Sequence, residues 1–194
     1  MNVPDRLRLP RCYDPERLGA DLAALEAAEW IAHFVASNYD GDWSVIPLRA
    51  PAGAKHPIQQ IFSNPAATDW AETLYLAACP YIREILSGFG CPLQAARLMR
   101  LGAGSRILEH RDPDLDFEAG FARLHVPIAT SPDVDFRLNG ARVDMAPGEL
   151  WYLRLSDPHC VFNRSTKPRV HLVIDAIVDP WLAAMFARAL ETAA

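Results

Sequence analysis

Two histidines and one aspartate have the residue types and spacing that most suggest chemistry in this sequence. His110 and Asp112 lie two positions apart, so on an extended strand their side chains share one face. His159 comes much later in the chain, and a facing strand can bring it to the same place. Two imidazoles and a carboxylate on one side of a metal ion are the ligand set of non-haem Fe(II) oxygenases, which keep the opposite positions open. His110, Asp112 and His159 are therefore candidate metal ligands and catalytic residues, and the alternative is that the histidines are surface or satisfied core residues.

An arginine follows in a segment that has the pattern of a strand. Arg169 begins the largely apolar run Arg169–Asp175. A guanidinium that points inward from such a strand needs an anionic partner, and its planar fork pairs well with a carboxylate. Arg169 is thus a candidate to bind the far carboxylate of a keto-acid cosubstrate. The alternative is a salt bridge at the surface.

Three further acids follow Asp112 and compete with it as the carboxylate ligand. Asp114, Asp116 and Glu118 lie in the same acidic segment. Only Asp112 has the two-residue spacing from His110 that places both side chains on one face of a strand. We interpret the other three acids as a solvated loop.

The first half of the chain predicts helices and one long loop. Asp14, Pro15 and Glu16 form a typical helix start, with a capping acid followed by proline in the first turn. The segment Trp43–Arg49 has the pattern of a strand. Residues 51–69 are rich in Pro, Gly and Ala, and a loop of this length in a compact domain is often functional, so we expect it to border the site.

From Pro92 onward the pattern changes to short strands with close turns. Asn139-Gly140 is a strong hairpin signal, and a closing helix begins at Asp179. About seven short strands favour a sandwich or jelly roll over a parallel sheet. The predicted fold is mainly β with flanking helices: a double-stranded β-helix (jelly roll, cupin-like) core preceded by N-terminal helices. We expect one domain, with a helical part and loop over residues 1–91, the jelly-roll core over 92–178 and a C-terminal helix over 179–194.

Composition excludes several classes of protein. The chain has 194 residues, 51% of them hydrophobic, and a net charge of −5 without a basic stripe, so we expect no nucleic-acid partner. No apolar run is long enough to span a bilayer, and the polar start of the chain is unlike a signal peptide. The four cysteines are scattered, which favours reduced thiols. These features predict a cytoplasmic protein with no membrane partner.

Several short motifs together resemble one known family. They are Arg97–Leu101, His110–Asp112, Arg123–His125, Gly148–Tyr152, Pro158-His159 and Arg169–Leu172. In combination, these motifs resemble the aspartyl/asparaginyl β-hydroxylases, a family of Fe(II)/2-oxoglutarate-dependent dioxygenases. The resemblance is clearest from Arg97 to Asp175 and weaker back to Trp43.

The resemblance implies roles for individual residues and a set of cofactors. His110, Asp112 and His159 would hold Fe(II), and O2 would be the oxidant. Arg169 would bind the 5-carboxylate of 2-oxoglutarate, and Arg123 with His125 would contact the other end of that cosubstrate. The family also has a serine that assists this binding in some members; the corresponding residue here is Met99, which is a departure from the pattern.

A second histidine competes with His159 as a ligand. The same resemblance implies that the arginine for the cosubstrate follows the second histidine ligand by a fixed number of residues. Arg169 follows His159 at that separation, and no arginine follows His171 at the same separation. His159 is therefore the preferred ligand. His171 shares a strand face with Arg169 and either lines the pocket or satisfies a hydrogen bond in the core.

The implied reaction is hydroxylation of an unactivated C–H bond, with succinate and CO2 as co-products. The substrate would be an amino acid, a peptide side chain or a related small molecule, since soluble bacterial relatives hydroxylate free amino acids such as proline. Arg97 is a candidate to bind a substrate carboxylate, and the alternative is a surface salt bridge. Trp43 is a candidate for an aromatic wall, and the alternative is core packing.

Two other classes of function are compatible with a metal-binding β core. One is a cupin-like metal-dependent isomerase or hydrolase that uses no 2-oxoglutarate. The other is a non-catalytic module that binds a small acid. Arg123 and Arg169 argue against the hydrolase, which does not need two arginines for a dicarboxylate. The complete ligand set argues against the binding module, which does not need the iron positions.

Overall fold

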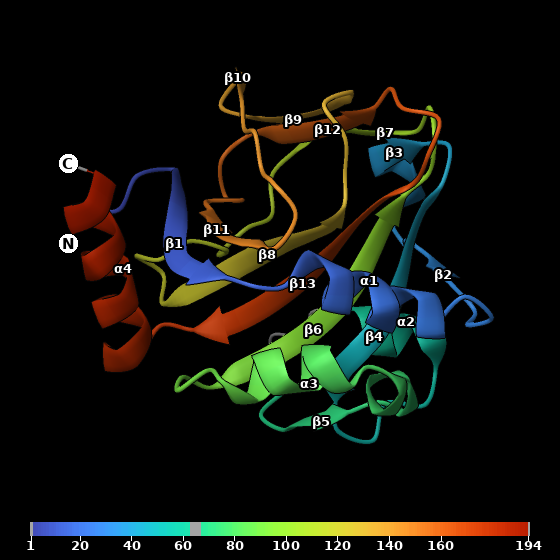
Figure 1. Ribbon diagram of the computed structural model, residues 1–194, viewed down its shortest axis with the longest axis horizontal. Coiled ribbons are helices and arrows are strands. Elements are labelled where there is room, and N and C mark those ends of the chain that lie inside the picture. Colours follow the sequence, from blue (N-terminus) through green and yellow to red (C-terminus); the bar gives the residue numbers. More distant parts are fainter. Residues whose placement is uncertain (1, 63–66, 194) are drawn as a thin grey trace.

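Two antiparallel sheets face each other in the computed structural model, which describes residues 2–62 and 67–193 (Figure 1). The main sheet has the order β1-β11-β8-β13-β6-β4-β2, with β5 paired to β4. Its strands are β1 (Arg6–Cys12), β2 (Ile31–Ala32), β4 (Trp43–Pro51), β5 (Trp70–Glu72), β6 (Leu93–Leu101), β8 (Phe121–Ala129), β11 (Glu149–Leu153) and β13 (Arg169–Ile177). The small sheet, of order β10-β9-β12-β7-β3, contains β3 (Tyr39–Asp40), β7 (Arg106–His110), β9 (Val134–Leu138), β10 (Ala141–Arg142) and β12 (His159–Asn163).

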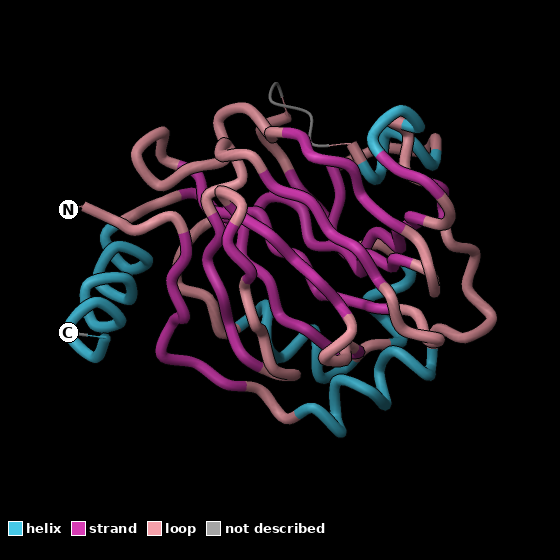
Figure 2. The backbone as a smooth tube through the Cα atoms, turned by 90° about the horizontal axis from the view of Figure 1, so that it is seen from above, coloured by secondary structure: helices cyan, strands magenta, loops and turns pink. Residues whose placement is uncertain are grey.

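Helices lie at the periphery of these sheets (Figure 2). They are α1 (Pro15–Ala24), α2 (Pro57–Ile61), α3 (Pro80–Ser87) and α4 (Pro180–Ala193), with the short 3-10 helices η1 (Ala36–Asn38) and η2 (Leu74–Ala78). The Asp14 side chain accepts hydrogen bonds from the first backbone N–H groups of α1, and Asp179 accepts one from Leu182 in α4. Both predicted helix starts are therefore confirmed. None of the helices in the described residues is long and apolar enough to cross a membrane.

The two faces of the main sheet pack into different cores. On β13, Val170, Leu172 and Ile174 belong to the larger core, which also contains residues of α1, α3 and α4. Because side chains alternate along a strand, Arg169 and Asp175 occupy the other face, toward the small sheet. A second core fills the space between the sheets and includes side chains from both. The candidate site lies in the same space and is lined by residues of both sheets.

The predicted double-stranded β-helix with flanking helices is confirmed, and so is the hairpin at Asn139-Gly140. Both hairpin residues have positive φ, 51° and 72°, as a two-residue turn between β9 and β10 requires.

The expected boundary at Pro92 is not a boundary of the sheet. Strands β1 and β4 lie before it, yet β1 pairs with β11 and β4 pairs with β6. Leu7 and Leu9 of β1 are buried at alternate positions, but Pro10 and three arginines conceal this pattern in the sequence. Proline is tolerated here because β1 is at the edge of the sheet. Within the expected loop 51–69 the structure has α2, and residues 63–66 lie outside the described part of the chain.

Candidate functional site

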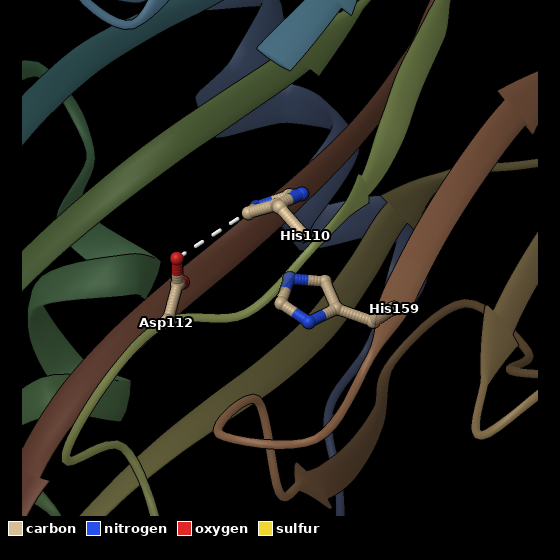
Figure 3. Close-up of side chains that lie close together, drawn as sticks. All are labelled: His110, Asp112 and His159. Carbon is tan, nitrogen blue, oxygen red and sulfur yellow. Dashed lines mark ion pairs between the residues drawn. The ribbon is translucent and has the colours of Figure 1, made fainter.

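The three predicted metal ligands come together at one end of the small sheet (Figure 3). β7 and β12 are neighbouring strands, and their register places His159 directly opposite His110. Asp112 follows the end of β7, where its backbone N–H donates to the carbonyl of Leu155 at 2.8 Å. One potential ligand atom from each side chain lies within 4.8 Å of the others. His159 thus reaches the site from an adjacent strand of the same sheet.

Hydrogen bonds orient both imidazoles for metal binding. Nδ1 of His110 lies 2.8 Å from the carbonyl of Leu108, and Nδ1 of His159 lies 3.0 Å from the carbonyl of Asp157. Since a carbonyl only accepts, Nδ1 carries the proton in each ring and Nε2 keeps its lone pair for a metal. Burial also lowers the pKa of His159, which favours the neutral imidazole that ligation requires.

A chain of buried charges stands behind Asp112. Arg123 on β8 donates from Nη1 to Oδ2 of Asp112 at 2.7 Å. The same guanidinium donates to both carboxylate oxygens of Asp175 on β13, at 2.6 and 3.0 Å. Arg97 on β6 donates to Asp175 as well, at 3.0 Å. Burial opposes ionisation of Asp175, but the two arginines outweigh that effect and hold its pKa well below the ordinary range.

Arg169 is a buried cation of a different kind. Its Nη2 donates to Nδ1 of His171 at 2.8 Å, but it forms no ion pair with any carboxylate of the described residues, and its Nε has no hydrogen-bond partner there. Burial lowers the pKa of Arg169 to about 9. Nearby His125 is buried, and neither of its ring nitrogens has a partner in the described part of the chain. These orphaned polar groups fit an anionic ligand.

All eight residues singled out from the sequence line one cavity of about 380 Å³. They are Trp43, Arg97, His110, Asp112, Arg123, His125, His159 and Arg169. This volume is in the range of small-molecule sites. The cavity therefore joins the three candidate metal ligands, the guanidinium of Arg169, which has no carboxylate partner among the described residues, and the indole of Trp43.

Trp43 packs in a core and also lines the cavity, so its contact with a substrate stays a prediction. It is buried in the core between the sheets, and it also lines the cavity beside His110, with ring centroids 6.1 Å apart. The ring of His33 also stacks on the indole, with ring centroids 3.6 Å apart and an angle of 9° between the planes. His33 was not among the residues predicted to form the site. Nothing in its local sequence pattern indicates this stacking.

Arg97 and His171 are now placed as well. Arg97 is buried and paired with Asp175, so the alternative of a surface salt bridge is wrong. His171 accepts a hydrogen bond from Arg169, which is one of the two roles left open for it. Among the rival acids, Asp114 does border the cavity, whereas Asp116 accepts a hydrogen bond from the backbone N–H of Ala119.

A comparison with models of known families identifies the family of this chain. The sequence model described as Aspartyl/Asparaginyl beta-hydroxylase matches residues 16–178. The chain is 30% identical to the L-proline cis-4-hydroxylase of Rhizobium meliloti (strain 1021), over 84% of this chain and 57% of that protein. It is 28% identical to L-proline cis-3-hydroxylase 2 of Streptomyces sp, over 86% of this chain and 58% of that protein. The chain thus spans a little over half the length of these relatives.

A solved structure supports the fold. It is an oxidoreductase of the 2OG-Fe(II) oxygenase family from Burkholderia pseudomallei, with a TM-score of 0.57 and 17% identity over 89% of this chain and 85% of that one. At this level of identity the likeness concerns the arrangement of strands and helices.

Proposed function

The chain belongs to the aspartyl/asparaginyl β-hydroxylase family, and on that premise we propose that it is an Fe(II)- and 2-oxoglutarate-dependent dioxygenase acting on a small amino acid. It would hydroxylate an unactivated C–H bond and release succinate and CO2. The proline hydroxylases among its relatives support this class of substrate. His110, Asp112 and His159 are proposed as the iron ligands, because they offer two neutral imidazoles and one carboxylate within reach of one ion.

The single observation that carries the proposal is that the buried guanidinium of Arg169 has no carboxylate partner in the part of the chain that the structure describes. A buried arginine without a carboxylate partner is costly, and this cost is removed when a ligand supplies the anion. A 2-oxoglutarate molecule whose keto-acid end faces the metal site would place its second carboxylate farther along the cavity. Arg169 lines that cavity, and a guanidinium can hold a carboxylate through two parallel hydrogen bonds.

The neighbouring residues support the same assignment. His125 lines the cavity with both ring nitrogens unpaired in the described part of the chain, so it is proposed to hydrogen-bond the cosubstrate. Arg123 donates to Asp112 and Asp175, contacts that the sequence did not predict. A contact of Arg123 with the cosubstrate itself stays a prediction.

In the proposed mechanism, residues of this chain position the substrate and shield the C–H bond that reacts. Bound iron with 2-oxoglutarate and O2 would supply the oxidising chemistry. His110 and His159 present Nε2 because backbone carbonyls fix their Nδ1–H groups. Arg123 fixes one oxygen of Asp112, so the other oxygen is available for the metal. Trp43 and the surrounding apolar side chains exclude water from the C–H bond that reacts.

Charge in the cavity favours a substrate with a carboxylate. Arg97, Arg123 and Arg169 line the cavity together with Asp112, and Asp175 lies behind them. With Fe(II) and a dianionic cosubstrate bound, one positive charge remains in this group, and a substrate carboxylate near Arg97 would balance it. Asp114 at the exposed rim can accept from an ammonium group. A free amino acid carries both of these charges.

Succinate formation tests the proposal. The purified protein would be incubated in air with Fe(II), 2-oxoglutarate and a panel of amino acids that includes L-proline. We expect succinate together with a product heavier than the substrate by one oxygen atom. Asp112→Ala should abolish both, whereas Glu109→Ala should not, because Glu109 is an exposed residue of β7, the strand that leads to Asp112, and lies outside the cavity lining. Full activity in Asp112→Ala would exclude Asp112 as a ligand.

A further inference from the structure

A buried aspartate far from the metal ligands in sequence is connected to one of them through an arginine. Asp175 on β13 pairs with Arg123, and Arg123 in turn pairs with Asp112. We propose that Asp175 is a positioning residue that acts through Arg123 to orient the Asp112 carboxylate and thereby sets the metal affinity of the site. This inference rests on the proposed function.

The connection between Asp175 and Arg123 is built into the main sheet. The two residues are directly opposite each other on the paired strands β13 and β8. The guanidinium uses Nε and Nη2 for the two oxygens of Asp175, at 2.6 and 3.0 Å. Such a two-point pair fixes the plane of the guanidinium as well as its position. Arg97, from β6 on the other side of β13, holds the same carboxylate at 3.0 Å.

This pairing determines what Arg123 can offer to Asp112. With Nε and Nη2 engaged by Asp175, the contact with Asp112 is made by Nη1, which donates to Oδ2 at 2.7 Å. The other oxygen, Oδ1, faces His110, 3.7 Å from its Nε2. The carboxylate therefore presents Oδ1 on the side of the two imidazoles, as a ligand with one coordinating oxygen would.

Asp112 needs such external support because it lies beyond the end of β7. Its side chain is 29% exposed, whereas that of Asp175 is 4% exposed. The link through Arg123 thus ties a partly exposed loop carboxylate to the rigid interior of the main sheet. If Asp175 were neutral, the fork of Arg123 would be released to pair with both oxygens of Asp112, and it would compete with the metal for Oδ1.

Metal binding in the absence of cosubstrate tests this inference directly. Co(II) would be titrated into the apo-protein while the visible absorption of the bound ion is followed. Asp175→Asn keeps the shape of the side chain but removes its charge. We expect it to weaken Co(II) binding by about 10- to 100-fold, as is typical when a partner of a metal ligand is lost. The absorption bands of the bound Co(II) should also change. Wild-type affinity in a folded Asp175→Asn protein would overturn the inference.

Asp135 provides a matched control. It is also a buried aspartate held by two arginines, Arg137 and Arg164, both at 3.1 Å, but neither contacts a metal ligand among the described residues. Asp135→Asn should leave Co(II) binding unchanged even if it lowers the melting temperature as much as Asp175→Asn does. An equal loss of Co(II) affinity in both variants would show a general effect of stability and overturn the positioning role.

A second variant shows whether the effect passes through Arg123 and covers the case in which Asp175→Asn does not fold. Arg123→Lys keeps the charge but lacks the planar fork that pairs with Asp175 at two points while a third N–H group contacts Asp112, so it should weaken Co(II) binding by a similar factor. Adding Asp175→Asn to Arg123→Lys should then cost no further affinity. Wild-type affinity in Arg123→Lys, or additive losses in the double variant, would exclude this link. A wild-type protein that binds no Co(II) would instead overturn the proposed metal site itself.

Discussion

Replacing Arg169 with methionine should stabilise the ligand-free protein while it abolishes 2-oxoglutarate binding. Most substitutions of buried residues destabilise a protein, so the expected direction is unusual. It follows from the absence of a carboxylate partner for Arg169 in the described part of the chain. Without its ligand, the folded protein carries an uncompensated charge in its interior, and methionine fills much of the same space without that charge.

The magnitude follows from the cost of burying the charge. Burial lowers the pKa of Arg169 to about 9, against about 12.5 for an ordinary arginine, and about 1.4 kcal/mol for each pH unit gives about 5 kcal/mol. The substitution also removes the hydrogen bond from Arg169 to His171, which offsets about 1–3 kcal/mol of this gain. The net stabilisation should be about 2 kcal/mol or more. For a protein of this size that raises the melting temperature by about 4–8 °C.

Thermal unfolding with and without 2-oxoglutarate is the assay. In the wild type, a ligand at about one hundred times its Kd should add about 2.7 kcal/mol of stability, and Arg169→Met should lose this increment. Arg97→Met is the matched control, because Arg97 is equally buried but is paired with Asp175. Removing one partner of a buried ion pair is destabilising, so Arg97→Met should lower the melting temperature.

Two results would refute this reasoning. If Arg169→Met were destabilised as strongly as Arg97→Met, the guanidinium of Arg169 would have a compensating partner in the ligand-free protein. If 2-oxoglutarate still raised the melting temperature of Arg169→Met by the wild-type amount, the cosubstrate would bind elsewhere.

Two further predictions concern pH and the aromatic wall. Burial holds the pKa values of His125 and His171 well below 6.5, so below that pH the unfolded chain binds more protons than the folded one. The free energy of unfolding, measured with urea, should therefore fall between pH 7 and pH 5 by up to about 1.4 kcal/mol per pH unit for each histidine. A free energy that does not change over this range would contradict the prediction. Trp43→Ala should lower the free energy of unfolding by about 3–5 kcal/mol in the same assay, and it should raise KM for the amino acid but not for 2-oxoglutarate. Trp43→Phe should retain most of the stability and most of the affinity for the amino acid. Equal changes in the two KM values would contradict an aromatic wall on the substrate side.

The part of the site that depends on local spacing was predictable from the sequence. His110 and Asp112 share a face because of their two-residue separation, and the apolar strand around Arg169 indicated a buried guanidinium in need of an anion. The structure places all of these side chains on one cavity. The strand pattern after Pro92 and the hairpin signal were likewise sufficient for the jelly-roll architecture.

The part that depends on register between distant strands was not predictable. Asp175 shares a face with Arg169 by the same alternation, but its partners Arg97 and Arg123 come from two neighbouring strands. Nothing in one sequence indicates which residues stand opposite one another there. The edge strand β1 was missed for a related reason, because an edge position tolerates the proline and the exposed arginines that conceal its alternation.

The visible absorption of the complex with Fe(II) and 2-oxoglutarate would test the central claim most directly. The apo-protein would be mixed with both under anaerobic conditions, and the spectrum would be searched for the charge-transfer band of 2-oxoglutarate chelated to iron. We predict a band in the wild type and none in His159→Ala, because His159 lies opposite His110 and supplies the second imidazole. No band in the wild type at saturating concentrations, or an unchanged band in His159→Ala, would contradict the proposed site.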